Sequence, residues 1–211
     1  MRPRGFTLVE MLVVMTISAI LVAAAVPAFQ WTIARNRISD ATNQLLSHLE
    51  YARMEASRRG NAVSLCRTLD ANLATPVCSS ASTAGVDGND WAVGWVVFEK
   101  VPPNLDAANV EAGDQVIFRQ QAMGAMAAPG VRAMIHSNAA GGEFFAYLPR
   151  GTPGVIGSVA TTFAVDYGTV LTPITGNRAL ASISLTSAAR CIPISGLGAL
   201  RVARTAAGVC L

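Results

Sequence analysis

The side chains that could support catalysis or bind a metal ion are few and scattered along this chain. The two histidines, His48 and His136, lie far apart in sequence, and neither stands at ligand spacing from a cysteine or a second histidine. Asp87 and Asp90 lie in a glycine-containing stretch without the further oxygen ligands of a calcium loop. We therefore expect no catalytic residue, no metal site and no cofactor, and we interpret these four residues as surface, rim or solvated loop positions.

The four cysteines, Cys66, Cys78, Cys191 and Cys210, include no CxxC pair, which argues against a zinc site. Disulfides are the better interpretation. Sequence order favours Cys66 with Cys78 and Cys191 with Cys210, although four cysteines permit three pairings. Disulfides persist in oxidising compartments, so they predict a domain outside the cytoplasm.

A long uncharged run near the start of the chain dominates its composition. Residues 11–34 contain no charged side chain, and 24 helical residues would reach about 36 Å, enough to cross a bilayer core. Arg2 and Arg4 precede this run and supply two of the three net positive charges, so global charge does not indicate a nucleic-acid partner. The positive-inside rule places these arginines in the cytoplasm and the rest of the chain across the membrane.

A cleavable signal peptide is the alternative interpretation of this run. Residues 22–28, VAAAVPA, offer a superficially suitable cleavage site after the apolar segment. Glu10 argues against it, because an acid this close to the apolar run is unusual in a signal peptide. A carboxylate at membrane depth costs roughly 2.5–3.5 kcal/mol, and it therefore usually marks a partner or a function.

The stretch GFTLVEMLVV over residues 5–14 resembles the processing site of type IV prepilins and type II secretion pseudopilins. The resemblance implies that a prepilin peptidase cuts between Gly5 and Phe6 and that the new amine of Phe6 is N-methylated. It also implies that Glu10 pairs with the Phe6 amine of a neighbouring subunit during filament assembly. Such a pair would offset the cost of burying either charge alone.

A helix is expected to continue beyond the apolar run, with a kink or local loosening at Pro27. Glu50 and Arg53, like Glu55 and Arg59, stand at helical pair spacing, and Gly60 is placed to end the helix. Apolar residues recur at steps of three and four and form one stripe: Ile38, Ala41, Leu45, Leu49, Ala52 and Ala56. The stripe predicts that a sheet covers this half of the helix.

Strand signals separated by turns follow Gly60. The expected strands cover residues 62–66, 91–98, 116–119, 131–136, 144–148, 161–165, 180–186, 191–195 and 200–204. The motif Gly196-Leu197-Gly198 lacks the third glycine of a dinucleotide-binding fingerprint, and we interpret it as a turn. The fold class is α+β: a long N-terminal helix, transmembrane in its first half and amphipathic in its second, packed on an antiparallel β-sheet.

The part of the chain after the membrane run resembles the minor-pilin and pseudopilin group that contains FimT, FimU and GspH. Residues 43–66 look like the passage from helix to first strand in that group, and residues 91–98, WAVGWVVF, match its Trp-x-x-Gly-Trp strand. We expect Trp91 and Trp95 to share one strand face and to pack in the core.

Some FimT-like proteins bind DNA through a C-terminal Gly-Arg-x-Arg motif, and this resemblance points to the stretch GALR over residues 198–201. Only Arg201 of the two motif arginines is present. Arg204 stands three positions later and would point to the opposite face of a regular strand. Arg190 and Arg178 could enlarge a basic patch, but DNA is not the favoured partner.

The resemblance divides the chain into a leader (residues 1–5), a transmembrane helix (6–29), an amphipathic helix (30–60) and a β-rich periplasmic or extracellular domain (61–211). The function expected is a minor pilin of a type IV pilus that helps to initiate assembly or form the tip. An H-type minor pseudopilin of a type II secretion system is the alternative, and a DNA-binding minor pilin for transformation is a further one. The expected partners are other pilin subunits, the prepilin peptidase and the bacterial inner membrane.

Overall fold

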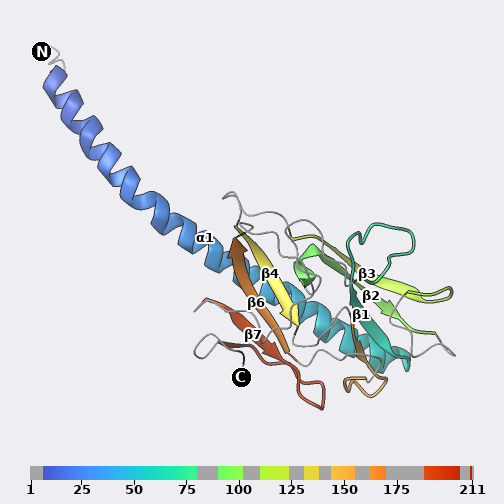
Figure 1. Cartoon of the computed structure of the whole chain (residues 1–211). Coiled ribbons are helices and arrows are strands. Elements are labelled where there is room, and N and C mark those ends of the chain that lie inside the picture. The colour runs from blue at the N-terminus through green and yellow to red at the C-terminus, as the bar shows by residue number, and fades with distance from the viewer. Residues whose placement is uncertain are drawn as a thin grey trace, which may run out of the picture.

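The computed structural model describes residues 7–79, 90–101, 110–123, 131–137, 144–154, 162–169, 188–204 and 210. One long helix carries two antiparallel sheets on its second half, and its first half stands clear of them (Figure 1). The α+β class is therefore as expected from the sequence. The sheet content differs, since the described residues form two four-stranded sheets where a single sheet was expected.

Helix α1 spans Leu8–Arg59 and contains 52 residues. Thr7 caps its start by accepting a hydrogen bond from the backbone N–H of Glu10 at 3.2 Å. Gly60 ends it in the left-handed conformation, with φ 69°, and donates its N–H to the Ala56 carbonyl. The helix runs without interruption through Pro27, whose expected effect was a kink or local loosening.

The first sheet has the strand order β3-β2-β1-β5, and all its pairings are antiparallel. Its strands are β1 (Val63–Arg67), β2 (Gly94–Glu99), β3 (Gln115–Gln121) and β5 (Phe144–Tyr147). Because β1 follows the helix directly and lies in the middle of this sheet, the whole sheet is fixed to the end of α1. Strand β3 forms one edge and pairs only with β2 within this sheet.

The second sheet has the strand order β4-β6-β7-β8 and is also antiparallel throughout. Its strands are β4 (Val131–Ser137), β6 (Thr162–Thr169), β7 (Arg190–Pro193) and β8 (Ala203–Arg204). The strand expected over residues 180–186 lies outside the described residues. A backbone bridge between Asp90 and His136 links the two sheets.

The predicted strand over residues 91–98 was wrong at its beginning. Trp91–Val93 form a short 3-10 helix, η1, because the Asp90 carboxylate accepts the N–H of Ala92 and caps a helical turn. Trp91 and Trp95 therefore do not share a strand face. Both indoles are nevertheless fully buried in one core, as expected.

The core lies between the striped half of α1 and both sheets. All six residues of the predicted stripe are buried there, and Leu45 and Leu49 have no exposed surface. Phe145 and Phe163, one from each sheet, pack edge-on at 6.4 Å between ring centroids. The stripe thus organises a core to which the two sheets contribute together.

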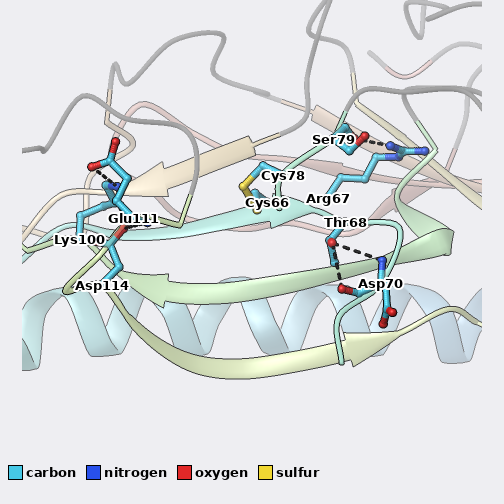
Figure 2. Close-up of a disulfide and its surroundings, with 9 residues drawn as sticks. All are labelled: Cys66, Arg67, Thr68, Asp70, Cys78, Ser79, Lys100, Glu111 and Asp114. Atoms are coloured by element: carbon cyan, nitrogen blue, oxygen red, sulfur yellow. Dashed lines mark hydrogen bonds and ion pairs between the residues drawn. A yellow bond between two sulfur atoms is a disulfide. The ribbon is translucent and has the colours of Figure 1, made fainter. Parts of the chain in front are cut away.

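A buried ion pair closes the base of the β2–β3 connection. The Lys100 ammonium has no exposed surface and lies 2.7 Å from an Asp114 carboxylate oxygen. The same carboxylate accepts the backbone N–H groups of Val101 and Glu111. The chain is therefore pinned where it leaves β2 and where it returns towards β3 (Figure 2).

Candidate functional site

The exposed half of α1 is the most unusual surface of the molecule. Its segment Leu8–Ala25 has a mean hydropathy of 2.4, and none of it is buried. Large apolar side chains are exposed on every side of it, including Leu8, Met15, Ile20 and Leu21. A soluble monomer rarely exposes so large an apolar surface, and the segment is long enough to cross a bilayer core.

Glu10 is the acid in the first turn of this exposed segment. Its position suits the positive end of the helix dipole, and its backbone N–H is already held by Thr7. The side chain is exposed and forms no ion pair with the residues that the structure describes. Gly5 and Phe6, the predicted processing residues, lie outside the described part of the chain.

Two disulfides join Cys66 to Cys78 and Cys191 to Cys210, with Cα atoms 5.5 and 5.6 Å apart. This is the pairing that sequence order favours. The first bridge ties the end of β1 to the loop that follows it (Figure 2). The second ties β7 to the C-terminal end of the chain. Each bridge therefore fastens a peripheral segment to a sheet strand.

Two arginines that sequence reasoning missed hold the first disulfide loop, one buried and one exposed. Arg67 has no exposed surface, and its guanidinium donates to the carbonyls of Asp90, at 2.8 Å, and Ser79. Figure 2 shows the contact with Ser79. Arg119 donates from β3 to the carbonyls of Ala71 and Leu73. The acceptors are backbone groups far away in sequence, so no local pattern could have indicated these contacts.

The described candidate DNA-contacting arginines lie on or beside the β7–β8 pair. Arg190 and Arg204 are register partners on β7 and β8, but the Arg190 guanidinium donates to the carbonyls of Ala188 and Ala189. Arg201 precedes β8 and donates its backbone N–H to the Pro193 carbonyl. Arg178 lies outside the described residues.

Arg53 forms a contact that its helical spacing did not predict. Instead of pairing with Glu50, its guanidinium donates to the carbonyls of Gly151, at 3.0 Å, and Leu197, at 2.9 Å. Gly198 has φ 79°, and a Cβ there would collide with the Gly151 carbonyl oxygen. The motif at residues 196–198 is thus a turn, as expected, and it docks the β7–β8 hairpin on α1.

An ion network surrounds the end of α1. Glu55 accepts hydrogen bonds from Arg58, at 2.7 Å, and Arg59, at 2.5 Å, and Arg59 also contacts Glu99 at 2.5 Å. Hydrogen bonds from Arg58 and Arg59 lower the pKa of Glu55 to about 2. The Glu55–Arg59 contact follows from helical spacing, whereas the link to Glu99 on β2 does not.

The candidate chemical residues are dispersed in the structure. No group of three or more histidine, cysteine, aspartate or glutamate side chains that could hold a metal ion occurs among the described residues. His136 and Asp90 are buried, so their interpretation as surface or solvated positions was wrong. Asp90 was misread because its carboxylate satisfies the N–H groups of Ala92 and Ile135 instead of water. Asp87 lies outside the described residues, and His48 is half-buried at the rim of the core.

Comparison with known proteins places most of the chain in one family. The family model described as type II transport protein GspH matches residues 41–198, and the model of the prokaryotic N-terminal methylation motif matches residues 1–26. The type IV major fimbrial protein FimA of Dichelobacter nodosus is 33% identical over 111 residues, which cover 53% of this chain and 60% of that relative. The matched stretch therefore spans less than two thirds of the relative.

Two crystal structures of the type IV minor pilin FimU of Pseudomonas aeruginosa are similar to this chain at low sequence identity. The first is 16% identical to this chain, with a TM-score of 0.40, and the matched region covers 80% of this chain and 93% of the FimU chain. The second is 17% identical, with a TM-score of 0.41, and the matched region covers 82% of this chain and 91% of the FimU chain.

Proposed function

This chain belongs to the GspH family, and on that premise we propose that it is a minor pilin of a type IV pilus that helps to initiate assembly or form the tip. Pilin and pseudopilin families are structural, and their members assemble with other pilin subunits. The observation that carries the proposal is the union of an N-terminal methylation motif with an apolar helix segment that its own fold leaves uncovered.

Membrane anchoring precedes assembly in this proposal. The apolar segment Leu8–Ala25 holds the precursor in the inner membrane, and Arg2 and Arg4 keep its N-terminus in the cytoplasm. Both disulfides then form on the periplasmic side, in an oxidising compartment. Prepilin peptidase cuts between Gly5 and Phe6, and the helix stays in the mature protein.

Assembly then exchanges lipid for neighbouring helices around the same apolar segment. Glu10 would meet the methylated amine of Phe6 from an adjacent subunit, and the pair would enter an apolar environment together. Separation of these two charges in such an environment would be costly, so the contact favours subunits in one axial register. The exposure of Glu10 in the isolated chain leaves its carboxylate available for this contact.

A minor pseudopilin of a type II secretion system is the second candidate, and the description of the matching family model favours it. The two candidates share the anchor, the processing site and the charge pair. They differ in the assembly that the subunit joins, a type IV pilus or a type II secretion system. Deletion of the gene would abolish surface pili in the first case and secretion of periplasmic substrates in the second.

The decisive experiment is mass spectrometry of the mature N-terminus. The proposal expects a chain that begins with methylated Phe6, whereas a cleaved signal peptide would yield a start near residues 25–30 and would refute it. For the assembly step, Glu10→Leu is expected to insert in the membrane normally and to be depleted from sheared filaments. Val9→Leu is the matched control, because it changes an adjacent exposed side chain without adding or removing a charge.

DNA binding is a separate outcome that a shift assay with the full chain would reveal. Because backbone carbonyls already engage the Arg190 guanidinium, we expect weak retardation that disappears at physiological salt. Persistent retardation that Arg201→Ala removes would add DNA to the partners.

A further inference from the structure

His48 joins the helix to the edge of the first sheet. Its Nδ1 accepts a hydrogen bond from the Trp95 indole N–H at 3.2 Å, and its ring lies on Phe118 with centroids 4.0 Å apart. Trp95 belongs to β2 and is fully buried, and Phe118 belongs to the edge strand β3. One imidazole on α1 therefore contacts both β2 and β3.

The geometry requires the neutral form of His48. Because Nδ1 accepts from Trp95, it carries no proton, and the ring hydrogen must be on Nε2. Protonation would place a second donor opposite the buried indole N–H, which would lose its acceptor. A buried donor without a partner is unfavourable, so the contact is stable only while Nδ1 is free.

The described neighbours offer no charge that would stabilise a protonated ring. On α1 the positions one turn away are Gln44, Leu45, Tyr51 and Ala52, none of them a carboxylate or a basic side chain. On β2 the neighbour of Trp95 on the same face is Val97, and on β3 the neighbour of Phe118 is Gln120. Arg119 alternates to the other face, where it binds the carbonyls of the disulfide loop.

We propose that His48 is a pH-sensitive latch, which in its neutral form holds β2 and β3 on α1 and on protonation releases the edge strand β3. Strand β3 is the element able to respond, because among the described strands β2 is paired on both sides and β3 on one. Acidification would therefore loosen one edge of the domain while the core under β1 stays packed. The inference concerns the folded domain and does not depend on the filament in which it serves.

The pKa of His48 gives the direction of the response. Burial lowers it below its ordinary value, so the unfolded or released state takes up a proton more readily than the latched state. As pH falls through the ordinary range of histidine, the latched state loses stability relative to the released one. The loss continues until the latched ring is itself protonated.

Amide hydrogen exchange of the full chain in detergent, corrected for intrinsic rates, tests the latch between about pH 7.5 and pH 5. We expect protection of β3 to fall at least about tenfold in the wild type, a fold-change typical of losing one buried hydrogen bond. His48→Gln keeps a side-chain acceptor without titration and should remove this pH dependence. His136→Gln, which changes the other histidine of the chain, should retain it.

An unchanged pH dependence in His48→Gln would overturn the proposal. Should that variant fail to fold, the wild-type protein still tests the proposal by NMR, since the Trp95 indole N–H resonance must shift with the His48 titration. An indole resonance that stays fixed while His48 titrates would equally refute the latch.

Discussion

The two halves of helix α1 have the same backbone structure and opposite relations to the rest of the chain. Between Leu8 and Ala25 the apolar residues surround the helix, and its own fold covers none of it. Between Ala34 and Arg59 most apolar residues form one stripe that is buried against the two sheets, while Met54 stays exposed. The difference shows that side-chain pattern, and not helix formation, decides whether a segment finds its partner inside or outside its own chain.

The largest expected contrast comes from one substitution made in each half. Leu45→Ala should lower the free energy of unfolding of the β-domain by about 2–5 kcal/mol, because it leaves a cavity under both sheets. Leu21→Ala, the same change on the uncovered half, should alter it by less than about 0.5 kcal/mol. Urea denaturation of the full chain in detergent measures both. Equal effects would mean that the two halves are not independent.

Disulfide removal should have the next largest effect. The double variant Cys66→Ser, Cys78→Ser is expected to lose about 3 kcal/mol, because an open loop gains entropy in the unfolded state. Cys191→Ser with Cys210→Ser opens the longer loop and should lose slightly more. Both losses belong to the β-domain, so membrane insertion of the uncovered half should be unchanged in carbonate extraction.

The docking of the β7–β8 hairpin on the covered half can be broken at a single glycine. Gly198→Ala should cost about 1–3 kcal/mol, since its left-handed backbone and the nearby Gly151 carbonyl both exclude a Cβ. Gly196→Ala is the matched control, because open space surrounds that position. Thermal melts of the two variants should therefore separate clearly, and coincident melts would contradict the docked arrangement.

The smallest effect is expected from the ion network at the end of the covered half. The pKa of Glu55 lies well below its ordinary value of 4.5, at about 2. The contribution of Glu55 to the free energy of unfolding is therefore present above about pH 4.5 and disappears as pH falls towards 2. Glu55→Gln should reduce the loss of stability between pH 4.5 and pH 2, and at neutral pH it should lower the free energy of unfolding by less than about 1 kcal/mol. Glu50→Gln, an exposed acid on the same helix, should leave the profile unchanged.

Sequence alone predicted the features that depend on local pattern. The stripe of α1, the stop at Gly60 and most described strands follow from periodicity and turn residues that act over a few positions. The 3-10 turn at Trp91 was missed because the capping acid precedes a segment that otherwise reads as strand. The division into two sheets was missed because strand order depends on contacts between distant segments.

The candidate site was predicted unevenly for the same reason. Glu10 stands out, since an acid beside a long apolar run is locally conspicuous. Arg53 and Arg67 carry no such signal, because their acceptors are backbone carbonyls that only the completed fold brings near. His48 was interpreted as a rim residue, and its hydrogen bond with Trp95 across 47 positions was beyond sequence reasoning.

The Lys100–Asp114 pair makes the β2–β3 connection a suitable site for inserting a label. Since both ends of the intervening stretch are fastened to one carboxylate, its length is uncoupled from the pairing of the two strands. A peptide tag or fluorophore site inserted among residues 102–109 would therefore label the subunit without altering its sheets. Such a label would allow individual copies of this chain to be followed.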